Sequence, residues 1–162
     1  MLGFCGLSFD KVREEKVSLK GLKDLKDFTL YMLMEIRHSH IPIPDICKEY
    51  VTRCDGELGN FLEKVCEQFE DNGGKSFEGL WEEELQKSGE GSSLKKEERE
   101  LLHRFSKNFG YCNTGMQISA IEQYLQEVEK LILQREKKFQ DNKKVILYFG
   151  VMSGLLLSII LL

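Results

Sequence analysis

The last stretch of the chain, residues 145–162, carries no charged side chain, and this feature constrains the fold more than any other. The run reads VILYFGVMSGLLLSIILL and follows Lys143 and Lys144. At 1.5 Å per residue a helix of this length spans about 27 Å, close to the roughly 30 Å hydrocarbon core of a bilayer. A buried core helix would need to be surrounded by protein, but the other apolar stripes are largely used in packing one another. We therefore expect a C-terminal transmembrane helix at 145–162.

The flank of this segment predicts its orientation. Basic residues precede it closely, namely Arg135, Lys137, Lys138, Lys143 and Lys144. The positive-inside rule then places the preceding body in the cytoplasm. Within the segment, Gly150 and Gly154 form a GxxxG motif, which permits close helix approach in a membrane. Helix association through these glycines and lipid-facing glycines without a partner are both open alternatives.

The remainder of the chain has the composition of an all-α domain. Its 162 residues fit about one domain, only two prolines occur, and the helix formers Glu, Lys, Leu and Gln dominate. Apolar residues recur at helical spacing in successive segments. They predict helices at about 12–39, 43–54, 58–69, 77–85, 93–109 and from 115 to the end. We therefore predict a bundle of about six helices, whose long last helix continues into the transmembrane segment.

Local signals mark the helix ends. Pro44 suits the first turn of the second helix, Gly56 is a candidate C-terminal cap, and Ser76 is a candidate N-cap. The sequence TGMQ at 114–117 matches a capping box that would begin the last helix. Residues 87–93, KSGEGSS, read as a flexible hinge. This hinge is too short to separate domains, so the body at 10–144 is predicted to be one bundle.

Charge and cysteine content exclude several classes. The formal net charge is −4, with 23 basic and 27 acidic residues, so the chain lacks the basic field that nucleic acid binding requires. The five cysteines are odd in number and show no CxxC spacing, which indicates reduced thiols facing the cytosol. Residues 1–9 have no basic n-region and too short an apolar run for a secretion signal. They are interpreted as the apolar stump of an N-terminal membrane segment.

One constellation has metal-ligand chemistry. His38 and His40 precede Cys47 and Cys54, and imidazole and thiolate both bind zinc. The spacing matches no familiar zinc pattern, the histidines sit at a helix end where the dipole favours a cation, and the cysteines fall on the packing stripe. We interpret these residues as structural and predict no metal site.

No catalytic or cofactor-binding residues are predicted either. Glu82, Glu83 and Glu84 are consecutive, so they should fan around a helix as a solvated face instead of converging on a substrate. Trp81 is expected to be a core anchor. The sequence has no GxGxxG or GKS/T motif and no local signature of a thiol with a histidine base. The chain is therefore not predicted to be an enzyme.

Several segments together resemble the stage III sporulation protein AB family of endospore-forming bacteria. Their order and spacing hold over nearly the entire chain. They are EIRHSHIPIP at 35–44, FEGLWEEEL at 77–85, LKKEERELLHRFSKNFG at 94–110, MQISAIEQYLQEVEKL at 116–131, and the tail KKVILYFGVMSGLLLSIILL at 143–162. The family's acidic residue and isoleucine before a proline-containing turn are matched by Glu35, Ile36 and Pro42.

This resemblance implies a scaffold. The family is a membrane-anchored helical bundle similar to the cytoplasmic domain of the type II secretion platform protein. It would lie in the mother-cell membrane around the forespore and contribute to the channel complex between the two cells. One implied partner is the secretion-type ATPase that is encoded beside it, which is the AA protein of the same stage. The others are further channel components and the lipid bilayer.

The chain departs from the family pattern at two kinds of position. Members usually begin with a transmembrane segment, whereas residues 1–9 are too short to span. Either a first anchor is missing here, which we favour, or this member has a tail anchor alone. His38 and Ser39 also replace an aromatic residue and a glycine, and Ser106 and Asn113 replace a glycine and an aspartate. These changes weaken any charge-based role for the turn near Ser106.

Two other classes of function are also compatible with the sequence. The chain could be a tail-anchored membrane enzyme with dispersed site residues, which requires a pocket with a shifted carboxylate or histidine. It could also be a homo-oligomeric bundle that associates through Gly150 and Gly154. Neither alternative involves sporulation.

Overall fold

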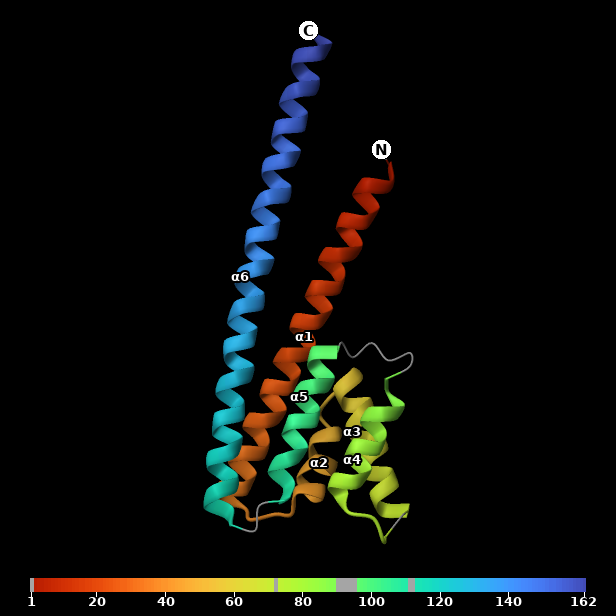
Figure 1. Ribbon diagram of the computed structural model, residues 1–162, viewed down its shortest axis with the longest axis vertical. Coiled ribbons are helices and arrows are strands. Elements are labelled where there is room, and N and C mark those ends of the chain that lie inside the picture. Colours follow the sequence, from red (N-terminus) through yellow and green to blue (C-terminus); the bar gives the residue numbers. More distant parts are fainter. Residues whose placement is uncertain (1, 72, 90–95, 111–112) are drawn as a thin grey trace.

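The described residues form helices joined by turns, so the all-α prediction is confirmed. The computed structural model describes residues 2–71, 73–89, 96–110 and 113–162, with side chains from residue 10 onward. Within these ranges there are six α-helices and one short 3-10 helix (Figure 1). They are α1 (Leu2–His38), α2 (Ile43–Val51), α3 (Glu57–Asp71), α4 (Phe77–Lys87), α5 (Lys96–Ser106), η1 (Lys107–Gly110) and α6 (Thr114–Leu161).

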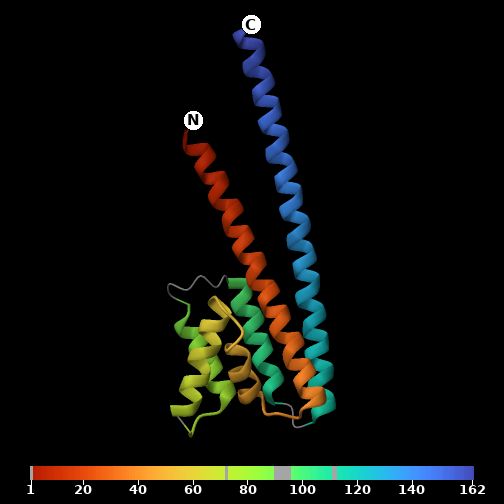
Figure 2. The same cartoon turned by 180° about the vertical axis from the view of Figure 1, so that it is seen from behind.

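Two long helices, α1 and α6, form the spine of the molecule. They run antiparallel, and in both views their free ends project from the same side of the body and diverge (Figures 1 and 2). The short helices α2, α3 and α4 lie on the side of α1 away from α6, whereas α5 packs against both α1 and α6. The backbone of residues 2–9 continues α1 without a break. The division of the chain at residues 9 and 144 stays a prediction.

Trp81 is at the centre of the core, as predicted. Its side chain is fully buried, and its ring lies 4.9 to 6.5 Å from five phenylalanine rings, measured between centroids. These rings belong to Phe28, Phe61, Phe77, Phe105 and Phe109. Because they come from α1, α3, α4, α5 and η1, one aromatic cluster joins most of the bundle.

Several predicted helix boundaries are confirmed. The first helix ends at His38, one residue from the predicted Ser39, and Pro44 lies in the first turn of α2. The Ser76 hydroxyl caps α4 by accepting a hydrogen bond of 3.1 Å from the Gly79 amide. The predicted hinge at 87–93 lies mostly outside the described residues.

Two predicted caps are wrong. The second helix already ends at Val51, and Gly56 instead precedes α3, with a φ of +98° and a carbonyl that accepts from the Asn60 amide. The last helix is capped by Asn113, whose side chain accepts a hydrogen bond of 2.8 Å from the Gly115 amide. Asparagine is a strong N-cap residue. Thr114 is therefore the first helical residue and does not head a capping box.

The turn between α2 and α3 brings the backbone close to Gly59. This glycine is buried, and a Cβ atom there would lie 2.5 Å from the carbonyl oxygen of Cys54. That distance is below any real contact of a Cβ atom. Only glycine therefore allows α3 to start so near the preceding turn.

Candidate functional site

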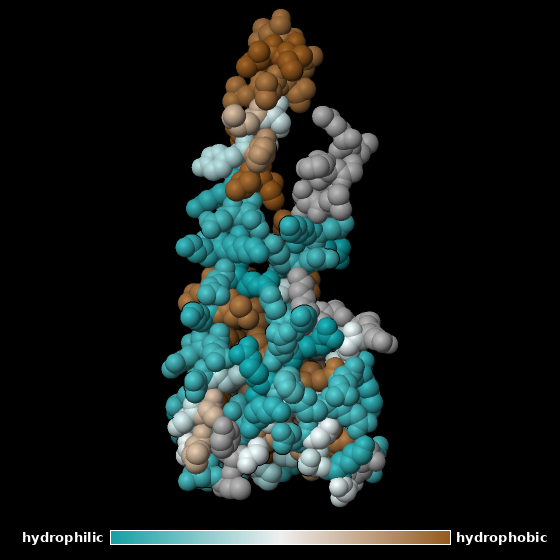
Figure 3. Space-filling model, in the orientation of Figure 1, coloured by the Kyte–Doolittle hydropathy of each residue, from teal (hydrophilic) through white to brown (hydrophobic). Residues whose placement is uncertain are grey.

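The C-terminal part of α6 is the most distinctive surface of the molecule. Among the described residues, one helix is long and apolar enough to cross a membrane, and none of its most apolar window is buried. Figure 3 shows the apolar side chains of this part standing clear of the body, above a hydrophilic band. The helix is unbroken from Thr114 to Leu161, so the apolar part is a direct continuation of a body helix.

Charged contacts join α1 to α6 along the spine. Lys23 lies 2.8 Å from Glu136, and Lys26 lies 3.1 Å from Glu129, measured between side-chain nitrogen and oxygen. Further along the pair, Arg37 forms an ion pair with Glu122. The three glutamates recur every seven residues, so they lie on one face of α6. This ladder was not predicted, although the seven-residue spacing is visible in the sequence.

Nearer the chain ends, the contact between α1 and α6 is a hydrogen bond. The Asn142 amide donates to the Glu15 carboxylate at 3.3 Å. Asn142 precedes the apolar segment by three positions. The two helices therefore remain in contact up to the base of the predicted transmembrane helix. The three ion pairs and this hydrogen bond together define the register of α1 against α6.

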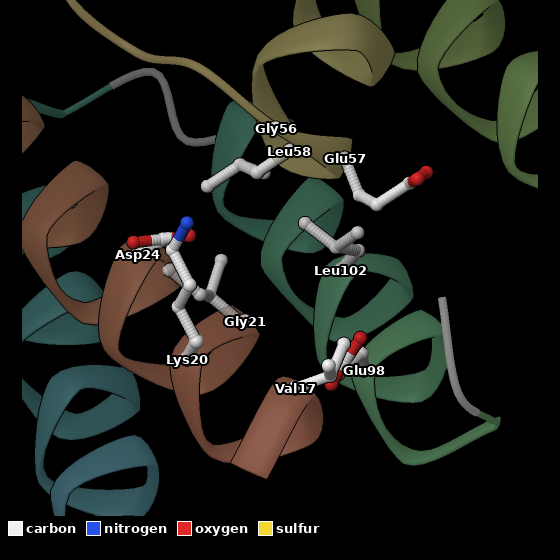
Figure 4. Close-up of a pocket in the computed structure, with 10 residues that line it drawn as sticks. Val17, Lys20, Gly21, Asp24, Gly56, Glu57, Leu58, Glu98 and Leu102 are labelled. Carbon is white, nitrogen blue, oxygen red and sulfur yellow. The ribbon is translucent and has the colours of Figure 1, made fainter. Parts of the chain in front are cut away.

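The body contains a cavity of about 250 Å³ between α1, α3 and α5 (Figure 4). Its walls include Lys20 and Asp24 of α1, Glu57 of α3 and Glu98 of α5. Glu98 is only 5% exposed and approaches α1 at Gly21, where a Cβ atom would lie 3.0 Å from its carboxylate.

The ionisable groups in the described lining of this cavity are carboxylates and a lysine. Burial raises the pKa of Asp24, which is the kind of shift that the enzyme alternative requires. The described lining nevertheless contains no histidine, cysteine or serine. A thiol or hydroxyl nucleophile with a histidine base is therefore not present among these lining residues.

The histidines and cysteines considered as zinc ligands lie in different environments. His38 and His40 are exposed, whereas Cys47 is fully buried in the core and burial raises the pKa of its thiol well above the usual range. His40 has a φ of +52°, which reflects the tight turn before Pro42. Within the described ranges, no three histidine, cysteine or acidic side chains are grouped so as to hold a metal ion.

The three consecutive glutamates of α4 fan around the helix, as predicted, but they do not form a solvated face. Glu83 pairs with Lys75 at 2.8 Å on the surface, and Glu82 bonds to Ser106 and to His103. Glu84 is 5% exposed and accepts a hydrogen bond of 2.8 Å from Gln68 of α3. The prediction is therefore wrong for Glu84, because a polar partner from another helix allows its burial.

Comparison with known proteins shows the family. The family model for stage III sporulation protein AB matches residues 1–162. Stage III sporulation protein AB of Bacillus subtilis (strain 168) is 27% identical over 157 residues, which cover 97% of this chain and 90% of that protein.

A solved structure has the same fold. The structure of stage III sporulation protein AB (SpoIIIAB) superposes with a TM-score of 0.67 at 22% identity, covering 76% of this chain and 97% of the other. Neither relative bears the name of an enzyme. By the match of the family model over its whole length, this chain belongs to the stage III sporulation protein AB family.

Proposed function

We propose that this protein is a non-enzymatic scaffold of the channel between mother cell and forespore. In this proposal it is anchored in the mother-cell membrane facing the forespore and docks a secretion-type ATPase through its cytoplasmic body. The observation that carries the proposal is the unbroken α6, which runs from the packed bundle into an exposed apolar segment. Such a helix holds a rigid body close to the bilayer surface.

The proposed orientation rests on charge. Lys143 and Lys144 lie at the base of the apolar segment and are exposed. Basic residues next to a membrane helix favour the cytoplasmic side. The free ends of α1 and α6 also project from the same side of the body (Figure 1), as expected if the body lies on one side of a membrane.

The ATPase docking surface is proposed at the end of the body remote from the membrane. The HSHIPIP turn, residues 38–44, lies at the end of the molecule opposite the C-terminus (Figure 1). Its first three residues are exposed. A second, separate candidate is the WEEELQKS segment, residues 81–88, which runs along α4 away from that end of the body (Figure 1). Its Glu83 is half-buried and its Lys87 is exposed. Loops and helix ends on a rigid scaffold commonly carry contacts.

The test is a binding measurement with the full chain in detergent and the AA protein of the same stage. We expect saturable binding, and we expect His38→Ala with His40→Ala to weaken it, since both side chains are exposed. The matched control is Lys107→Gln with Lys130→Gln, which alters two exposed side chains outside both candidate surfaces. If the unaltered chain fails to bind even at high micromolar concentration, direct docking is contradicted.

Self-association through the membrane helix is an additional proposal. A Cβ atom at Gly150 or Gly154 would meet nothing within 4 Å beyond the adjoining backbone of its own helix, so this face of α6 is open to a second helix. Gly150→Leu with Gly154→Leu should then abolish energy transfer between labelled copies in vesicles. Leu156→Ala, on the same exposed segment, provides the control. An unchanged transfer efficiency in the glycine variant would exclude this motif as the contact.

A further inference from the structure

Basic side chains from both long helices meet at one level of the molecule. Asn142 bonds to Glu15, so residues 11–20 of α1 lie beside the stretch of α6 that immediately precedes the apolar segment. The bases at this level are here called the basic collar, and all of them are exposed. They are Lys11, Arg13, Lys16, Lys20, Lys137, Lys138, Lys143 and Lys144.

The basic collar differs from the bases below it in its partners. Deeper in the spine, Lys23, Lys26 and Arg37 each form an ion pair with a glutamate of α6. By contrast, no collar residue has an acidic group within 4.0 Å among the side chains that the structure describes. The bases of α1 that pair with α6 therefore lie deeper in the spine, and the described bases of the collar have no such ion pair.

Acidic residues do not cancel the collar. Three exposed acids share its level, Asp10, Glu14 and Asp141, against eight bases. Glu136, which also falls here, is paired with Lys23, whereas Glu15 keeps its negative charge because the Asn142 amide that bonds to it is neutral. Among the described side chains, four unpaired acids therefore face eight bases. The chain as a whole has a formal charge of −4, so the positive charge is concentrated beside the membrane segment and the rest of the body is acidic.

We propose that the basic collar binds the headgroups of anionic phospholipids. This inference rests on the proposed membrane anchor, because the collar reaches headgroups only if 145–162 spans the bilayer. A lysine or arginine next to an anionic surface strengthens binding roughly fivefold, and the contribution is screened by salt. Lysine side chains also reach the interface from a helix by extending along it, which suits Lys143 and Lys144. The acidic body is repelled by the same surface, so the charge pattern favours one placement of the molecule.

The experiment uses the full chain reconstituted in phosphatidylcholine vesicles. Flotation after an alkaline wash first establishes whether the chain is anchored. Electron spin resonance then compares spin-labelled phosphatidylglycerol with spin-labelled phosphatidylcholine at the protein surface. We expect the anionic probe to be preferred, and the preference to decline with rising salt. It should fall with Lys143→Gln and Lys144→Gln, and fall further when Lys137→Gln and Lys138→Gln are added. It should reach parity when Lys11, Arg13, Lys16 and Lys20 are also replaced by Gln.

The matched control is Lys107→Gln with Lys130→Gln, which removes two exposed bases that lie off the collar and have no ion pair in the described part of the chain. It should keep the full preference. Equal retention of both probes by the unaltered chain, or an equal loss in the control, would overturn the collar while leaving the anchor intact. Displacement of the anionic probe by inorganic phosphate at constant ionic strength would also overturn it, in favour of a free phosphate ligand. A chain that does not float overturns the anchor and the collar together.

Discussion

The indole nitrogen of Trp81 donates a hydrogen bond of 2.9 Å to the backbone carbonyl of Leu102. This bond links α4 to α5 inside the aromatic cluster, where neither group has access to water. A second bond of the same kind joins Tyr124 of α6 to the carbonyl of Leu101 at 3.0 Å. The backbone carbonyls of Leu101 and Leu102 in α5 therefore accept hydrogen bonds from both α6 and α4.

Trp81→Phe should destabilise the bundle by about 2 to 4 kcal/mol, because it removes a buried hydrogen bond and leaves a cavity. Tyr124→Phe removes only the corresponding hydroxyl and should cost about 1 kcal/mol. Urea unfolding of the full chain in detergent, followed by far-ultraviolet circular dichroism, measures both. Equal effects of the two substitutions would contradict the central packing role of Trp81.

Gly59→Ala should destabilise the protein by about 2 kcal/mol or more, because the new methyl group would overlap the carbonyl oxygen of Cys54. Gly73→Ala is the control, since a Cβ atom there meets nothing within 4 Å. Thermal unfolding of the two variants should therefore give clearly different midpoints. Similar midpoints would show that the turn before α3 relaxes without cost.

The free energy of unfolding should fall as the pH rises from about 9 to about 11. Burial, followed by the charge of Glu70, raises the pKa of the Cys66 thiol from 9.0 to about 11. In this window the unfolded chain has lost the thiol proton and the folded chain retains it, so deprotonation favours unfolding. Below pH 9 the contribution is fully present. Cys66→Ala should give a shallower decline in urea unfolding across the same pH range, and an identical slope would argue against this assignment.

Met152→Arg should prevent stable membrane insertion of the C-terminal segment. An arginine near the centre of a membrane helix raises the apparent insertion free energy by about 2.5 to 3.5 kcal/mol. Met152→Leu should insert as well as the original sequence. An insertion assay in microsomes with an engineered glycosylation site beyond the segment distinguishes these outcomes. Efficient insertion of both variants would mean that the hydrophobicity of residues 145–162 does not drive their insertion into the membrane.

Much of the helical framework could be predicted because each helix carries its own periodic apolar stripe. The end of α1 and the cap at Ser76 follow from local chemistry, namely the prolines after His38 and the serine hydroxyl. At the start of α6, however, Asn113 and Thr114 are adjacent and both are good capping residues. The local sequence does not decide between them, because either side chain can accept a hydrogen bond from an amide of the first turn.

The features that sequence reasoning missed depend on contacts between distant segments. Glu84 is buried because Gln68 reaches it from another helix, and nothing within α4 signals this. The ladder between α1 and α6 needs the register of two helices about a hundred residues apart. Its glutamates at Glu122, Glu129 and Glu136 were visible as a seven-residue repeat, but their partners Lys23 and Lys26 do not share that spacing.

The unbroken course of α6 sets a distance. From Thr114 to Lys144 the helix rises about 46 Å at 1.5 Å per residue. If the apolar part spans the bilayer, the far end of the body is held at roughly that height above the membrane, with no joint in between to shorten it. The length of α6 would then set the distance between the HSHIPIP turn and the lipid surface, and any cytoplasmic partner that binds this turn would be held at that distance.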